Sequence, residues 1–90
     1  MRSIVSEVKY MVRLFNIFVE ADNISCDYEP ERSGKIGHVT VNTETEEIAK
    51  VDYSQYEYGK KMYVAQVRAK LAELLRQKDH IPSETFSIWY

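Results

Sequence analysis

Cys26 and His38 are the pair of side chains in this sequence that could act as a nucleophile and its base. A cysteine attacks as a thiolate, which needs a neighbouring base or positive charge to lower the pKa of its thiol. The two residues fall on neighbouring predicted strands, so proximity is conceivable. Cys26 nevertheless alternates with Ile24 and Tyr28, as a small buried apolar residue does. We therefore expect a structural cysteine, no catalytic residue and no enzyme activity.

The spacing of the remaining candidate ligands does not match a metal or phosphate site. His38 and His80 lie in different predicted elements, and no pair of histidines or cysteines has a zinc-site spacing. The acidic residues between 44 and 52 lack the oxygen spacing of a calcium loop and are expected to form a solvated hairpin. Residues 34–37 contain two glycines but open a strand, without the helix that follows a phosphate-binding loop. We expect no metal and no cofactor.

Aromatic and basic side chains are concentrated between residues 53 and 63. They are Tyr53, Tyr56, Tyr58, Tyr63, Lys60 and Lys61. Tyrosines can stack on nucleic-acid bases while lysines meet phosphates. Tyrosine is equally common half-buried, with its ring packed and its hydroxyl in water. Tyr56 and Tyr63 lie seven positions apart on one helical face, which favours a structural or interface role.

Length and composition predict one folded domain over residues 1–90. The chain is 44% hydrophobic and 29% charged, with three glycines and two prolines, which is typical of a globular domain. Its single cysteine excludes an internal disulfide. Polar residues such as Ser6, Glu7 and Lys9 interrupt the apolar N-terminal stretch, so neither a signal peptide nor a membrane span is expected. We expect a cytoplasmic protein.

The net charge of −2 conceals an uneven distribution. Residues 20–57 carry ten acidic and three basic side chains, whereas residues 60–78 carry six basic and one acidic. Opposite charges in two parts of one chain attract each other within the fold or across a dimer. We expect the acidic middle and the basic later segment to pair in one of these ways.

Polar residues recur every three or four positions between residues 3 and 22, which predicts a helix. They are Ser6, Lys9, Arg13, Asn16 and Glu20. Nearly all other positions are apolar, whereas an ordinary surface helix has an apolar stripe about 100° wide. Such a helix would have to bury more than one face, either beneath a sheet and a second helix or against another copy of the chain.

The rest of the chain predicts three strands and a second helix. Alternating apolar residues indicate strands over residues 24–29, 36–42 and 47–53, joined by short polar turns. The helix begins at the capping box of Ser54 and Glu57 or, because Gly59 is a weak point, near Lys60, and its pattern is strong from there to about Lys78. Its core stripe consists of Val64, Val67, Leu71 and Leu74. The apolar tail, residues 84–90, is expected to pack as an edge strand or to cover the core.

The expected fold class is therefore α+β, with the element order α-β-β-β-α. The three strands form an antiparallel meander, with room for a short fourth strand at the C-terminus, and both helices pack on one face of the sheet.

This element order is similar to that of the double-stranded-RNA-binding domain. In that family a glycine and a histidine lie between the first two strands, and a lysine pair opens the last helix. Gly34, His38, Lys60 and Lys61 occupy comparable places here. No proline follows Gly34 and the strands are rich in carboxylates, so we take the likeness as one of topology. It implies phosphate contacts by Lys60 and Lys61, and the hypothesis of nucleic-acid binding adds His38 and Arg68.

We expect first a non-enzymatic interaction module that is homodimeric or binds a protein partner, since surplus apolar surface marks interfaces. The expected interface residues are Val5, Val12, Phe18, Tyr56, Tyr63, Phe86 and Trp89. Nucleic-acid binding is the second hypothesis. A small-molecule site near Cys26, His38 and the tyrosines is the third.

Overall fold

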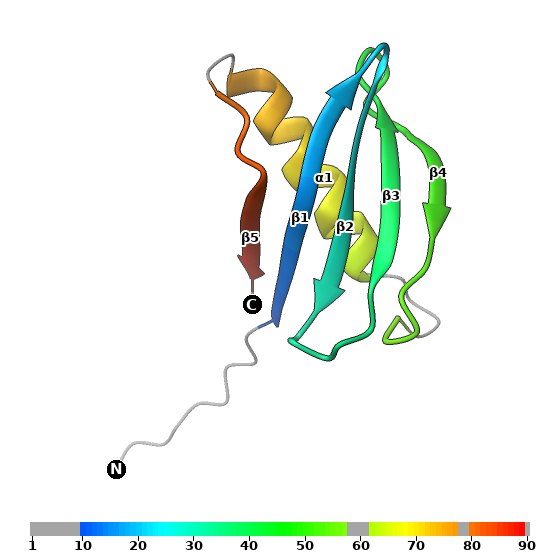
Figure 1. Ribbon diagram of the computed structural model, residues 1–90, viewed down its shortest axis with the longest axis vertical. Helices are drawn as coiled ribbons and strands as arrows, with labels where there is room; N and C mark the ends of the chain where they lie inside the picture. The colour runs from blue at the N-terminus through cyan, green and yellow to red at the C-terminus, as the bar shows by residue number, and fades with distance from the viewer. Residues whose placement is uncertain (1–9, 58–61, 78–79, 90) are drawn as a thin grey trace.

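The computed structural model describes residues 10–57, 62–77 and 80–89. These residues form six elements: β1 (Tyr10–Glu20), β2 (Asn23–Pro30), β3 (Gly37–Asn42), β4 (Ile48–Asp52), α1 (Met62–Gln77) and β5 (Glu84–Trp89). The strands make one antiparallel sheet in the order β4-β3-β2-β1-β5. Figure 1 shows α1 crossing behind the sheet, so that the helix covers one face and the other face is open toward the viewer.

The predicted arrangement of two helices and three strands is wrong, because the first segment is a strand. Residues 10–20 form β1, with Val12 and Leu14 fully buried on the helix side. Residues 3–9 lie outside the described part of the chain. Apolar Met11 and Phe15 lie on the opposite face, so the two-residue alternation of a half-buried strand is hidden. Branched and aromatic residues such as those of β1 favour strands, and this preference outweighed the helical spacing.

A β-bulge explains the spacing that imitates a helix. The register between β1 and β2 shifts between Phe15 and Phe18, and Asn16 adopts a left-handed conformation with φ of 55°. Asparagine tolerates this conformation better than most residues. Arg13 and Asn16 are three positions apart in the sequence. Because of the bulge, both side chains can lie on the open face of an extended strand, and Ile17 can reach the core.

The predicted meander and the later helix are confirmed as elements. β2, β3 and β4 follow one another in sequence and in the sheet. The C-terminal tail forms the expected edge strand, β5, which pairs with β1 from Tyr10↔Trp89 to Phe15↔Glu84. The sheet therefore has five strands where three or four were expected, and one helix where two were expected.

The core lies between α1 and the sheet. All four residues of the predicted helical stripe, Val64, Val67, Leu71 and Leu74, are buried. The sheet contributes Val12, Leu14, Ile24, Cys26, Tyr28, Val39 and Val41, which are all fully buried. Fully burying an aliphatic side chain of this size contributes roughly 1.5–3 kcal/mol. Packing of the buried α1 residues against these side chains therefore stabilises one face of the sheet.

The start of α1 is held by a carboxylate from the preceding loop. Glu57 Oε2 accepts a hydrogen bond from the Val64 backbone N–H at 2.8 Å, which satisfies one of the donors that a helix start leaves unpaired. Ser54 does not act as the expected helix cap. Its Oγ accepts from the Tyr56 N–H at 3.0 Å and so orders the loop.

The expected attraction between the acidic middle and the basic later segment occurs within the chain. Arg76 pairs with the Glu46 carboxylate at 2.7 Å, and Arg68 donates to the Glu46 carbonyl oxygen at 3.2 Å. Both contacts join α1 to the turn between β3 and β4.

Gly37 lies at a close approach that leaves no space for a side chain. It pairs with Tyr28 across the β2–β3 ladder, and an added Cβ would overlap the Tyr28 ring and the Ser54 backbone nitrogen. Tyr28 cannot withdraw easily, because its ring is fully buried and its hydroxyl accepts from the Ser54 N–H at 2.9 Å.

We expect Gly37→Ala to lower the free energy of unfolding by about 1–3 kcal/mol, the usual cost of overpacking. The measurement is urea unfolding followed by circular dichroism. Ser83→Ala, at an exposed position, is the control and should unfold like the wild type. Equal stability of all three proteins would contradict the close approach.

Candidate functional site

The face of the sheet turned away from α1, here called the open face, has an apolar and a polar half. Residues opposite each other in an antiparallel ladder share a face, so the register assigns its members. The apolar half, on β1 and β5, contains Met11, Phe15, Phe18, Phe86 and Ile88. The polar half lies mainly on β2, β3 and β4 and contains Asn23, Ser25, Asp27, Glu29, His38, Thr40, Lys50 and Asp52.

A chain of hydrogen bonds fixes His38 on the open face. Its Nδ1 lies 2.8 Å from Asp27 Oδ1 on the neighbouring strand, and Asn16 Nδ2 donates to Asp27 Oδ2 at 2.9 Å. The bulge in β1 therefore directs the Asn16 amide to Asp27, and Asp27 in turn orients the imidazole. Bulges commonly re-aim a side chain in this way.

The same hydrogen bonds keep Asp27 ionised. Partial burial by itself would raise the pKa of Asp27, but the hydrogen bonds from Asn16 and His38 outweigh it, so the pKa lies below its usual value. An ionised carboxylate only accepts hydrogen bonds, so we assign the imidazole proton to Nδ1. In the neutral form of the ring, Nε2 is then the acceptor.

Arg13 is held between an aromatic ring and two carboxylates. Its guanidinium lies 4.0 Å from the centroid of the Phe15 ring and pairs with Glu29 at 3.1 Å and Glu84 at 3.2 Å. Glu29 also accepts from the Gly34 N–H at 2.8 Å. The hydrogen bond from the Gly34 N–H is the largest effect that lowers the pKa of Glu29, and the hydrogen bond from Arg13 is the second. The arrangement shows how this face binds a guanidinium group.

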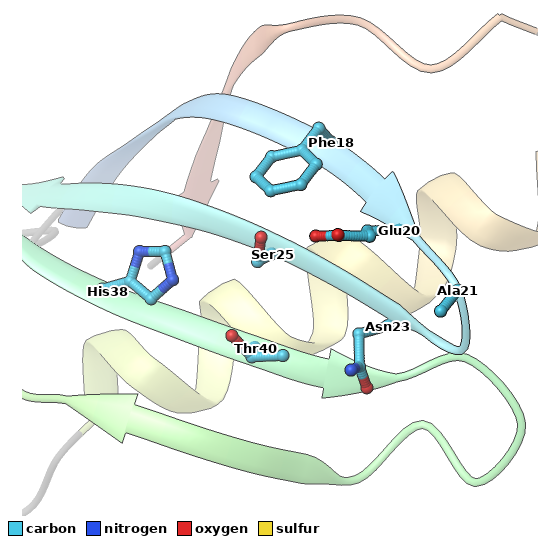
Figure 2. Close-up of a pocket in the computed structure, with 7 residues that line it drawn as sticks. All are labelled: Phe18, Glu20, Ala21, Asn23, Ser25, His38 and Thr40. Carbon is cyan, nitrogen blue, oxygen red and sulfur yellow. The ribbon is translucent and has the colours of Figure 1, made fainter.

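A hollow of about 450 Å³ lies on the open face across β1, β2 and β3. It is lined by Phe18, Glu20, Ala21, Asn23, Ser25, His38 and Thr40. Figure 2 shows these side chains together on the side of the sheet away from the helix. Its volume is within the range of small-ligand sites, about 300–1,000 Å³. Its lining carries one fixed charge, the Glu20 carboxylate, and neither lysine nor arginine.

The structure separates Cys26 from His38. Cys26 pairs with Val39 and faces the helix, whereas His38 lies on the open face, so the sheet stands between the two side chains. Cys26 is fully buried, and burial raises the pKa of its thiol to about 12. The cysteine is therefore a core residue, as expected, and is not activated as a nucleophile.

The residues proposed for phosphate contact do not gather on one surface. His38 lies on the open face and Arg68 on the helix that covers the other face. Lys60 and Lys61 lie outside the described residues. The open face itself carries five carboxylates, at Glu20, Asp27, Glu29, Asp52 and Glu84, against the cations Arg13 and Lys50.

The expected interface residues divide into exposed and buried groups. Phe18 and Phe86 are 52% and 43% exposed on the open face. Val12 is fully buried and Tyr63 is 6% exposed, so neither offers a contact surface.

Tyr56 and Trp89 are partly buried against the same core. Each packs edge-on against Tyr63, with ring centroids 5.7 and 5.6 Å away. Val5 lies outside the described residues.

Sequence reasoning missed Asn16, Asp27 and Arg13 as site residues. Asp27 had been placed on a strand next to that of His38, and the pair could have been proposed from this adjacency. The contacts that Arg13 and Asn16 make from β1 could not be proposed, because the sequence predicts a helix over residues 10–20.

Within the described ranges, no cluster of three or more candidate ligands could hold a metal ion, and no helix has the length and apolar character of a membrane crossing. Comparison with protein-family models, curated proteins and solved structures finds no match to this chain.

The lowered pKa of Asp27 predicts a pH dependence of stability. Its ionised form is favoured in the folded state, so its contribution is complete above the unfolded pKa of about 3.9 and is lost as pH falls through the lower folded value. Asp27→Asn should remove this part of the acid-induced loss.

The measurement is the urea midpoint between about pH 7 and about pH 2. Asp52→Asn, opposite His38 on β4 and outside the hydrogen-bond chain, is the matched control and should retain the Asp27 contribution to the acid loss. An unchanged acid profile of Asp27→Asn would contradict the assignment.

Proposed function

We propose that the chain is a non-enzymatic interaction module that forms a homodimer through the edge strand β5. The carrying observation is that β5 pairs with β1 on one side only. No described strand lies on its other side. An edge strand presents a row of backbone N–H and C=O groups that can pair with another strand.

The two edges of the sheet differ in the protection that edge strands usually carry. β4 has five residues, includes Lys50 and Asp52, and has a register irregularity next to β3. Charged residues and bulges of this kind discourage pairing. β5 has the sequence Glu-Thr-Phe-Ser-Ile-Trp, with one charge at its start and neither lysine nor proline. Its composition therefore favours pairing, and that of β4 opposes it.

The β5 sequence is complementary to itself in one antiparallel register. Phe86 and Ile88 lie on the open face, whereas Thr85, Ser87 and Trp89 lie on the helix side. A twofold axis at Ser87 keeps these faces matched, because residues opposite each other share a face. This register sets Phe86 against the partner's Ile88, and Thr85 against the partner's Trp89.

The dimer would remove apolar surface from water. Phe86 is 43% exposed and Ile88 is 52% exposed, and Met11 lies next to Ile88 in the β1–β5 ladder. Cross-strand apolar pairs contribute roughly 0.2–1 kcal/mol each beyond alanine. Most of the described open-face carboxylates lie on β2 and β4, at least two strands from β5, and Glu84, on β5 itself, is paired with Arg13.

Nucleic-acid binding has less support. Carboxylates outnumber cations on the open face, and phosphates would be repelled there. Arg68 is already bonded to the turn between β3 and β4.

Ser87→Cys should form a disulfide between two copies. Directly opposed residues have Cα atoms about 4.5–5.5 Å apart, within the range that a disulfide spans. Cys26 is fully buried and does not compete. Mild oxidation followed by a non-reducing gel is the measurement. Lys50→Cys, on the opposite edge, is the control, and crosslinking no greater than in this control would contradict the register.

The wild type should sediment as a dimer at tens of micromolar, roughly the range in which useful homodimers persist. Ile88→Lys should weaken the dimer at least about ten-fold, because it places a charge in the centre of the apolar contact. Ile36→Lys, at an equally exposed apolar residue in the β2–β3 loop, should leave it intact. A wild type that stays monomeric at this concentration would overturn the proposal.

A further inference from the structure

We propose that the hollow on the open face binds an arginine side chain presented by a partner protein. This site is distinct from the β5 edge and does not require the dimer. It rests on the shape of the hollow, on the chemistry of its lining and on a guanidinium site that the same face already contains.

The lining offers acceptors and an aromatic ring to a cation. Glu20 supplies a carboxylate, and the Ser25 and Thr40 hydroxyls can accept hydrogen bonds. The neutral form of His38 adds Nε2 as an acceptor when its Nδ1–H donates to Asp27, at 2.8 Å. Phe18, 52% exposed, provides a ring face over which a cation is attracted.

The surrounding charge favours a cationic ligand. No lysine or arginine lines the hollow, and the Asp27 carboxylate lies opposite His38 on β2, in contact with its Nδ1. Of the two cations on the described open face, Arg13 is already paired with Glu29 and Glu84. The other, Lys50, lies opposite Thr40 on β4 and is not among the lining residues. An anionic ligand would meet the Glu20 carboxylate, and no cation among the lining residues would offset it.

The Arg13 site indicates a guanidinium in preference to an ammonium. On this face the Arg13 guanidinium already lies over the Phe15 ring, at 4.0 Å, with carboxylates beside it. Phe18 and Glu20 repeat the combination of ring and carboxylate farther along β1, where they line the hollow. The planar guanidinium stacks on a ring and donates to several acceptors at once, which a compact ammonium does not.

The size of the hollow indicates that more than the guanidinium enters. A volume of about 450 Å³ accommodates the side chain with part of the backbone that carries it. Ala21 and Asn23 line the hollow at the β1–β2 turn, so we expect the partner segment to approach from that end of the sheet.

The test is a titration of the isotope-labelled full chain with N-acetyl-arginine amide, followed by amide chemical shifts. Saturable shifts are expected at Asn23, Ser25, His38 and Thr40, with a dissociation constant on the order of millimolar for so small a probe. N-acetyl-lysine amide should bind more weakly, and N-acetyl-glutamate amide should not bind.

Two variants locate the contacts. Phe18→Ala should weaken arginine binding about two- to five-fold, the range for an exposed cation–aromatic contact. Glu20→Gln should weaken it by a similar factor, whereas Glu44→Gln, exposed in the β3–β4 turn, should leave it unchanged.

The titration is repeated in Ile88→Lys, so that failure of the dimer and failure of this site are distinguishable. Equal affinity per chain is expected in the two proteins. The proposal is overturned if the shifts are absent, if lysine binds as tightly as arginine, or if Phe18→Ala and Glu20→Gln bind like Glu44→Gln.

Discussion

The constraint on which this structure depends is that a single amphipathic helix covers a five-stranded sheet. The stripe of α1 buries one face of β1, β2 and β3 and leaves the other face without a layer among the described residues. Chain length limits how much surface the fold can bury, since a domain of this size buries only about 60–65% of its unfolded surface. The open face and the two edges are therefore the parts of the molecule on which contacts with other molecules can be built.

Polar interactions on the open face serve both the fold and the candidate site. Glu29 joins β1 to the β2–β3 loop through Arg13 and Gly34, and Asp27 joins β1 to β3 through Asn16 and His38. Each carboxylate thus connects segments that are distant in sequence. The Asp27 connection holds His38, which lines the hollow, in a defined position without a covering layer, and this reduces the ordering cost of binding there.

The sequence was informative where one face of an element is apolar and the other polar. β3 alternates buried Val39 and Val41 with polar His38 and Thr40, and the α1 stripe has regular helical spacing, so both were predicted correctly. β1 was not predicted as a strand, because its open face is itself partly apolar. The hydrogen bonds of Asp27 depend on that strand and on its bulge, so the arrangement around His38 could not be predicted. Phe18 and Phe86 were named as contact residues; both are exposed, and their role stays a prediction.

The bulge at Asn16 also decides which residues reach the hollow. Strand side chains alternate with a period of two, so one additional residue inverts the side on which every later residue of β1 points. Ile17 consequently enters the core, while Phe18 lies opposite Ser25 on the open face. If the same sequence paired with β2 without the bulge, an unbroken alternation through Asn16 would turn Phe18 and Glu20 toward the helix and Ile17 toward the open face. The one-residue bulge in β1 thus determines which side chains of this strand line the hollow and which pack in the core.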